Sequence, residues 1–282
     1  MPLADSHPME PPSQLEHPEI GKTRMTVIRG ATWSAAPAAT AEYLGLLPRF
    51  GADPAIGAWA ETYARGHTGR LLWDVDFLVK NFRFSSCLNI GAAPFIFEYL
   101  LRKQRPDIRL RSVDLDVGRF PHAADILGLD IAQMDFERAD AATIRALGQF
   151  QCVVFCEIFE HLRIDILRTM RLLRELLAPD GILYLTTPNG GGSSALRKHL
   201  FRGRTGPDPV SEWSKLETVG HMGHVREYSF REVRDVLEFA GFTIDRYGYR
   251  RRSRGSRWRD TPQSLLRGIA PAWGSEIVLA AR

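Results

Sequence analysis

The sequence contains no long apolar run. No stretch approaches the roughly 18 consecutive apolar residues of a membrane-spanning helix, and the first residues are rich in Pro and Glu, unlike a signal peptide. Cysteine is also scarce. The chain has only Cys87, Cys152 and Cys156, an odd number whose spacing fits neither a disulfide framework nor a zinc site. We therefore expect a cytoplasmic protein with buried, reduced thiols and no membrane span.

The chain also lacks a large excess of charge of one sign. Its 37 Lys and Arg residues face 33 Asp and Glu residues, a formal net charge of +4. This balance permits an anionic partner without requiring nucleic acid. Arginines gather between Arg246 and Arg259, interleaved with Tyr247, Tyr249 and Trp258. Such a mixture can bind phosphate and stack on bases, but a solvated loop has the same composition, so nucleic acid is not the partner that we expect.

A length of 282 residues with 44% hydrophobic content indicates one large α/β domain with an appendage. Residues 1–24 are rich in Pro and poor in apolar side chains, which predicts a disordered tail. Apolar residues recur near every 3.6 positions between residues 40 and 82. We therefore assign 25–82 to an N-terminal helical cap, which either covers a ligand or packs under the sheet, and 83–282 to the main domain.

The main domain begins with a short apolar segment, a turn of small residues and a helical pattern. The segment Ser85–Ile90 is followed by Gly91, Ala92 and Ala93, and the helical pattern starts at Phe95. In an open parallel sheet, such a turn lies at the carboxyl end of a strand and directs backbone N–H groups toward a ligand. Small residues allow that ligand to approach the backbone closely.

Acidic residues end the next two predicted strands. Asp114 ends the second strand about 23 residues after Gly91, where nucleoside-binding sheets place an acid that accepts hydrogen bonds from ribose hydroxyls. An Asp after a strand can equally cap a helix, and Asp116 competes for the ribose role. The third strand ends with Asp135 and Phe136, where an adenine ring could be held, although an aromatic there is often part of the core.

The remaining strands follow in the same alternation with helices. A continuously apolar fourth strand, residues 151–156, leads into Glu157, and an amphipathic helix beginning near Leu162 follows. A fifth strand covers residues 182–187, and two further strands cover residues 242–249 and 276–281. The Gly-, Ser- and Arg-rich segment 190–225 is too long for a plain connection, and we interpret it as a substrate lid.

This ordered series of motifs resembles the class I S-adenosylmethionine-dependent methyltransferases of the small-molecule type over roughly residues 70–282. The segments that carry the resemblance are LNIGAA at 88–93, SVD at 112–114, MDF at 134–136, FQCVVFCEIFEHL at 150–162, LLAPDGILYLTTPN at 176–189 and HVREYS at 224–229. The resemblance implies a doubly wound, Rossmann-like α/β fold with seven strands, the last antiparallel.

The resemblance also implies S-adenosyl-L-methionine as the cofactor. The residues then expected to hold it are Asn89, Gly91, Ala92, Ala93, Asp114, Leu115, Asp135, Phe136 and Glu157. Family members usually carry an acid two residues before the first glycine, where this chain has Asn89, and further glycines in the turn. Restoring an acid by Asn89→Asp is expected to tighten cofactor binding. The departures also keep open a non-catalytic binding protein on the same fold.

Methyl transfer requires an aligned acceptor and, for a hydroxyl, a base that removes its proton. Our candidate catalytic residues are His161, Glu157 and His224, because His161 has a suitable unperturbed pKa and follows the fourth strand at the cofactor edge. A histidine at a helix start can also be purely structural. His221 and His224 are candidates for substrate contacts in the lid.

Glu157, Glu160, His161 and His224 also match the residues with which small-RNA 2'-O-methyltransferases hold a divalent metal. Metal-free small-molecule relatives carry a similar series, so no metal site is predicted. We expect S-adenosylmethionine-dependent O-methylation of a small-molecule acceptor, such as a sugar or natural-product hydroxyl. The alternative is metal-dependent RNA ribose methylation. No oligomeric state is predicted.

Overall fold

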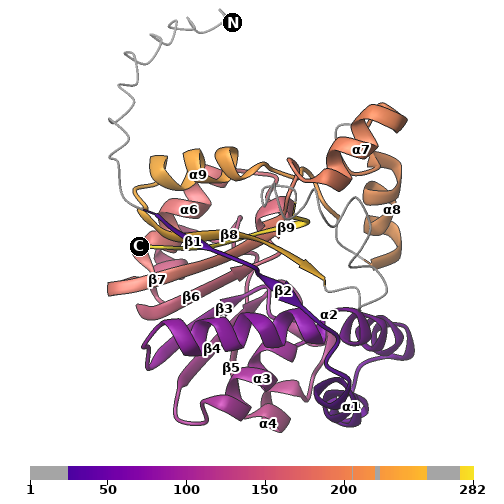
Figure 1. Ribbon diagram of the computed structural model, residues 1–282. Coiled ribbons are helices and arrows are strands. Elements are labelled where there is room, and N and C mark those ends of the chain that lie inside the picture. The colour runs from indigo at the N-terminus through magenta and orange to yellow at the C-terminus, as the bar shows by residue number, and fades with distance from the viewer. Residues whose placement is uncertain (1–24, 205, 220–222, 253–273) are drawn as a thin grey trace, which may run out of the picture.

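The computed structural model describes residues 25–204, 206–219, 223–252 and 274–282. The predicted tail at 1–24, His221 and the arginines beyond Arg252 lie outside the described residues. Within the described part, a mixed sheet is covered by helices on both faces (Figure 1). The strands are β1 (Thr26–Ile28), β2 (Thr32–Trp33), β3 (Ser86–Ile90), β4 (Arg109–Asp114), β5 (Asp130–Gln133), β6 (Phe150–Cys156), β7 (Leu177–Pro188), β8 (Ile244–Arg252) and β9 (Glu276–Ala281).

The sheet order is β1-β8-β9-β7-β6-β3-β4-β5, and β2 also pairs with β8. The strands from β3 to β7 run parallel to one another, while β9 is antiparallel to both of its neighbours. Seven of the strands are those predicted, including the antiparallel last strand. The sheet gains two more at its edge, because residues 26–33 of the predicted helical cap form β1 and β2 beside β8.

The two faces of the sheet carry separate apolar cores. The helices are α1 (Pro37–Leu46), α2 (Pro54–Asn81), α3 (Ile96–Gln104), α4 (Ala123–Leu127), α5 (Ala141–Arg145), α6 (Ile166–Glu175), α7 (Ser193–Arg202), α8 (Pro209–Val219) and α9 (Phe230–Phe239), with 3-10 turns at Leu47–Phe50, Val117–Arg119 and Phe159–His161. Helices α1 to α4 pack with alternate residues of the strands on one face, and α5, α6 and α9 pack on the other. Because both faces are covered, the central strand β3 is buried at every position.

Capping residues fix where several helices begin. Asp53 accepts hydrogen bonds from the backbone of Ala55 and Ile56, and Pro54 follows it at the first helical position of α2. Helix α6 begins at Ile166, four residues later than the apolar pattern suggested, because the Asp165 side chain accepts a hydrogen bond from the Arg168 backbone. The late start leaves the residues after β6 outside any long helix, at the carboxyl edge of the sheet.

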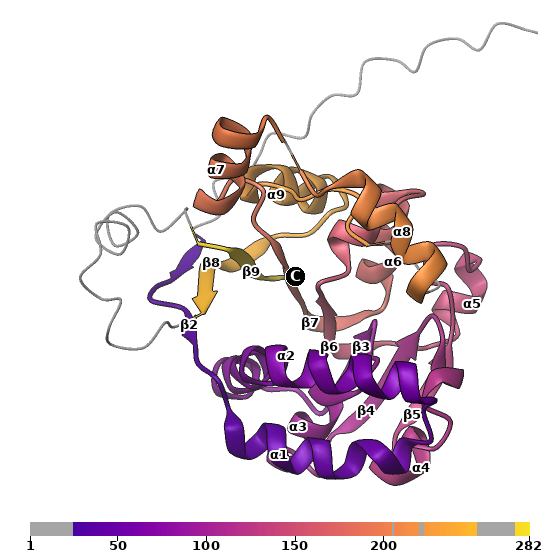
Figure 2. The ribbon, with the colours of Figure 1, turned by 90° about the vertical axis from the view of Figure 1, so that its right-hand side faces the viewer.

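Helices α7 and α8 occupy the segment that we interpret as a lid. They stand apart from both helical layers, as the two perpendicular views in Figures 1 and 2 show. The chain reaches α7 directly from the carboxyl end of β7. The lid role and the domain boundaries stay predictions. Among the described residues, no helix combines the length and the apolar character needed to cross a bilayer.

Candidate active site

The turn after β3 requires glycine at its first position. Gly91 has a φ of +75°, and a Cβ placed on it would lie 2.1 Å from Cδ1 of Ile158. The positive φ makes a side chain strained at this position, and any side chain would also have to displace the end of Ile158. The Gly91 and Ala92 N–H groups donate to the carbonyl oxygen of Val113 in β4, at 2.8 and 3.3 Å. These hydrogen bonds hold the turn against β4, the strand that ends with Asp114.

A cavity of about 310 Å³ lies beside this turn, at the carboxyl ends of β3, β4 and β6. Eight of the residues predicted for the cofactor or for catalysis line it: Gly91, Ala93, Asp114, Leu115, Asp135, Phe136, Glu157 and His161. Asn89 and Ala92 instead line a smaller cavity of about 30 Å³, which shares Gly91 and Ala93 with the larger one. His224 lines neither cavity.

One end of the larger cavity suits a nucleoside. The Asp114 carboxylate accepts hydrogen bonds from the backbone N–H groups of Ala93 and Asp116, at 2.8 and 3.0 Å. A carboxylate has about four acceptor positions, so Asp114 retains capacity for ribose hydroxyls. Its competitor Asp116 is in an ion pair with Arg119 at 3.0 Å. Leu115 lines the cavity and is 45% exposed, so it offers apolar surface that a bound ring could cover.

The Asn89 side chain is engaged behind the turn. Its amide Nδ2 donates to Oε1 of Glu98 at 2.7 Å, and the Ser112 hydroxyl donates to the same oxygen at 2.8 Å. Glu98 is fully buried, and burial raises its pKa to about 7. An aspartate at position 89 would face this carboxyl group, so we expect Asn89→Asp to destabilise the turn.

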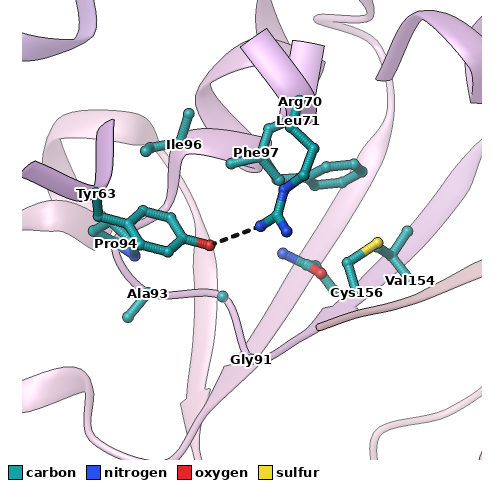
Figure 3. A pocket seen from close by; sticks show the side chains of 12 residues that line it. Tyr63, Arg70, Leu71, Gly91, Ala93, Pro94, Ile96, Phe97, Val154 and Cys156 are labelled. Atoms are coloured by element: carbon teal, nitrogen blue, oxygen red, sulfur yellow. Dashed lines mark hydrogen bonds between the residues drawn. The ribbon is translucent and has the colours of Figure 1, made fainter. Parts of the chain in front are cut away.

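Helix α2 contributes a buried cation that the motifs did not reveal. Arg70 Nη1 lies 2.8 Å from Oε2 of Glu157, and Nη2 donates to the Tyr63 hydroxyl at 3.2 Å. Figure 3 shows the guanidinium and the Tyr63 ring beside the Gly91 turn. The available signal was the spacing of Tyr63, His67 and Arg70, which places them on one face of a helix. The predicted cap therefore supplies polar groups to the wall of both cavities.

Both carboxylate oxygens of Glu157 have partners. Oε2 pairs with Arg70, and Oε1 accepts a hydrogen bond from the Thr186 hydroxyl at 2.8 Å. Burial favours the neutral acid, but the charges of Arg70 and Arg250 bring the pKa of Glu157 below its ordinary value. Glu157 is therefore held as a carboxylate that fixes the position of Arg70.

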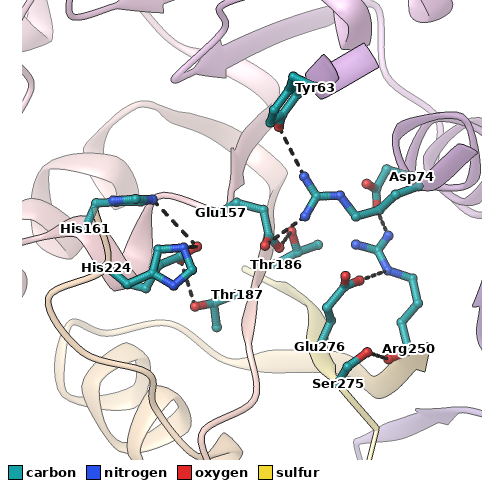
Figure 4. A network of polar contacts seen from close by, with 12 residues as sticks. Tyr63, Asp74, Glu157, His161, Thr186, Thr187, His224, Arg250, Ser275 and Glu276 are labelled. Atoms are coloured by element: carbon teal, nitrogen blue, oxygen red, sulfur yellow. Dashed lines mark hydrogen bonds and ion pairs between the residues drawn. The ribbon is translucent and has the colours of Figure 1, made fainter. Parts of the chain in front are cut away.

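Glu160, His161 and His224 form a second polar cluster, and Figure 4 shows its two imidazoles next to the Glu157 network. Glu160 is fully buried, and its Oε1 lies 3.9 Å from Nε2 of His161 and 3.8 Å from Nε2 of His224. The Thr187 hydroxyl donates to the other Glu160 oxygen at 2.9 Å. Burial raises the pKa of Glu160 well above its ordinary value, and the charge of Glu157 raises it further.

The outer nitrogens of the two imidazoles are also oriented. Nδ1 of His161 lies 3.1 Å from the carbonyl oxygen of Gly223, which can only accept, so this nitrogen carries the proton. Nδ1 of His224 faces a carboxylate oxygen of Glu227 at 3.9 Å. Each imidazole therefore directs its Nε2 toward Glu160. The ligand atoms of Glu160, His161 and His224 lie within 4.8 Å of one another, which is compatible with a shared proton or a bound cation.

The doubly wound sheet, the glycine turn and the acid at the tip of β4 define a nucleotide-binding α/β protein whose ligand lies at the carboxyl edge of the sheet. A family model described as "Methyltransferase domain" matches residues 63–247. The chain belongs to this family, the S-adenosylmethionine-dependent methyltransferases. Its cofactor is S-adenosylmethionine.

Solved structures with the same fold include a SAM-dependent methyltransferase from Archaeoglobus fulgidus, at 14% identity and a TM-score of 0.54, over 79% of this chain and 97% of that one. Another from Mesorhizobium loti has 15% identity and a TM-score of 0.50, over 75% and 97%. An O-methyltransferase family protein from Burkholderia thailandensis has 15% identity and a TM-score of 0.53 over 84% of this chain, which spans 62% of that protein. No curated protein matches the chain.

Proposed function

We propose that the protein transfers the methyl group of S-adenosylmethionine to a hydroxyl of a small metabolite, such as a sugar or another natural product. One observation carries the proposal. His161 lies in the wall of the larger cavity with its Nδ1 bound to the Gly223 carbonyl, so its Nε2 holds the lone pair that a base requires. A base in this position is needed for a hydroxyl acceptor, whose proton must leave as the new bond forms.

The residues divide into cofactor-binding and acceptor-side groups. Asp114 receives the ribose hydroxyls, Leu115 and Phe136 cover the adenine, and the Gly91 turn lies against the methionine part. Arg70, positioned by Glu157, offers a cation near the methionine carboxylate. The cavity fits this assignment because its glycine turn and its acid lie in one wall, with an apolar surface beside them.

S-adenosylmethionine supplies an electrophilic methyl carbon on a sulfonium sulfur. Transfer of this methyl group to the acceptor oxygen would leave the electron pair of the carbon–sulfur bond on sulfur and would require the hydroxyl proton to leave. His161 takes the hydroxyl proton at Nε2. The Glu160 carboxyl group lies 3.9 Å from that nitrogen, and the His224 ring packs edge-on against the His161 ring, with 4.9 Å between the ring centroids. We assign the reaction to the cytoplasm, where the three free thiols would stay reduced.

Screening a panel of hydroxyl, amine and thiol acceptors for a gain of one methyl mass tests this function. With an acceptor in hand, His161→Gln should lower kcat by about 100-fold or more, the usual contribution of a positioned base, without changing cofactor affinity. His122→Gln is the matched control, because His122 is exposed and lines neither cavity. Methylation of amines alone, or a wild-type kcat in His161→Gln, would refute the assignment.

A second candidate function is metal-assisted methylation of an RNA ribose, and the cluster of Glu160, His161 and His224 favours it. Two imidazoles and a carboxylate suit a divalent transition metal. Each imidazole has an acceptor on its outer nitrogen, as metal-ligating histidines usually do. Glu157 is not a member of the cluster, since Arg70 and Thr186 engage its two oxygens.

Metal analysis and RNA assays separate the two candidates. Metal-assisted RNA methylation predicts that the wild type binds Mn²⁺ or Zn²⁺ tightly and that Glu160→Gln loses this binding. It also predicts that the protein methylates a 3'-terminal ribose and that a chelator abolishes this activity. Activity on RNA that survives the chelator, or no activity on RNA, would remove the second candidate and leave the first.

A further inference from the structure

Several large apolar side chains of α7 and α8 are exposed to solvent. Five of them define what we call the α7–α8 surface: Leu196, Leu200, Phe201, Val210 and Trp213, with exposures of 47, 67, 81, 78 and 60%. Elsewhere in the described residues, large apolar side chains with comparable exposure are few: Val27, Leu115, Ile164 and Val225. Exposed apolar residues that occur singly need no explanation, whereas three of them on one short helix, Leu196, Leu200 and Phe201 on α7, point to an interaction site.

The α7 part of this surface is also basic, whereas α8 has two glutamates and one lysine. From Ser193 to Arg204 the chain has four cationic side chains and no acidic one. Lys198 pairs with Glu227 at 3.8 Å and Arg204 pairs with Asp208, whereas Arg197 and Arg202 have no acidic partner among the described residues. Leu196, Arg197 and Leu200 are all exposed residues of α7, so this helix presents both apolar and cationic side chains to solvent.

We propose that the α7–α8 surface docks on an anionic lipid membrane. The two helices project from the body of the molecule (Figures 1 and 2), so they offer protruding side chains to a soft surface. Aromatic and aliphatic side chains would enter the boundary between headgroups and acyl chains, and Arg197 and Arg202 would contact lipid phosphates. A protein partner would need an apolar groove of matching shape as well as acidic residues, a more demanding complement than an anionic bilayer provides.

The position of the surface gives the docking a functional consequence. Helix α7 follows directly from the carboxyl end of β7, and this edge of the sheet also holds the methyltransferase site. A membrane bound to α7 and α8 would therefore lie beside the acceptor side of the site and concentrate hydroxyl acceptors that partition into lipid. The docking itself depends on neither the cofactor nor the acceptor.

Vesicle sedimentation of the full chain tests the proposal. The wild type should sediment with vesicles of equal parts phosphatidylglycerol and phosphatidylcholine and stay in solution with phosphatidylcholine alone. The double variant Leu200→Ser/Phe201→Ser should bind at least about tenfold more weakly, because it removes the two apolar groups that would enter the bilayer. Val27→Ser, which shortens an exposed apolar residue on β1, is the matched control and should bind like the wild type.

The charged residues give a second comparison. Arg197→Gln/Arg202→Gln should weaken binding by about tenfold or more and reduce its salt dependence, whereas Arg29→Gln/Arg49→Gln, at exposed sites outside the surface, should not. Circular dichroism and thermal unfolding should match the wild type in every variant. Equal sedimentation of wild type and Leu200→Ser/Phe201→Ser would overturn the proposal, as would a failure of the wild type to bind. A dimer that only this variant abolishes would assign the surface to a second copy instead. Methyl transfer measured without vesicles is independent of all these outcomes.

Discussion

Glu98 links the stability of the cofactor turn to pH. Its carboxyl group is fully buried and accepts hydrogen bonds from Asn89 and Ser112, and burial raises its pKa from 4.5 to about 7. Because the folded-state pKa is raised, the folded chain binds more protons than the unfolded chain between these values. The free energy of unfolding therefore falls as the pH rises. The difference between the two pKa values corresponds to about 3 kcal/mol in total.

The variant Glu98→Gln removes this contribution, since glutamine has the shape of the protonated acid and cannot ionise. Urea unfolding at about pH 5.5 and about pH 8.5 should show the wild type losing about 2 kcal/mol more than the variant over this range. The control Glu61→Gln, at an exposed acid on α2, should follow the wild type. Parallel pH profiles for the wild type and Glu98→Gln would refute the reasoning, because they would mean that Glu98 does not change its charge on the folded protein in this range.

Two further substitutions test the buried contacts around the turn. Asn89→Asp should destabilise the fold by about 2 kcal/mol or more at pH 8, measured by urea unfolding, because a hydrogen-bond donor becomes a second carboxylate beside a buried acid. Adding Glu98→Gln should recover part of the loss, and tighter cofactor binding by Asn89→Asp alone would contradict the assignment. Arg70→Met should cost about 3 kcal/mol, since it leaves the largely buried Glu157 carboxylate without its cation. An unchanged unfolding midpoint for Arg70→Met would mean that the ion pair contributes nothing.

The sequence predicted the features that are local in the chain. Strands β3, β6 and β9 are short apolar runs, so the sequence alone identifies them. Asp114, which ends β4, is recognised by its spacing from Gly91. The positions that line the larger cavity follow the same strand ends, which explains why most of the predicted cofactor residues meet there.

The features that sequence missed depend on contacts between distant segments. Strands β1 and β2 are too short to show a pattern, and they exist because β8 pairs with them. Glu98 resembles a polar residue on an ordinary amphipathic helix, and only its contact with Asn89 shows that it is buried. Arg70 is likewise identified by its distance to Glu157, a residue 87 positions away, rather than by any motif.

Calorimetric titration with S-adenosylmethionine tests the central claim most directly, because it measures occupancy of the cavity without an acceptor. The wild type should bind one cofactor, Asp114→Asn should bind it at least about tenfold more weakly, and Asp116→Asn should bind nearly as the wild type does. No binding at millimolar cofactor would contradict the claim, and so would full affinity in Asp114→Asn.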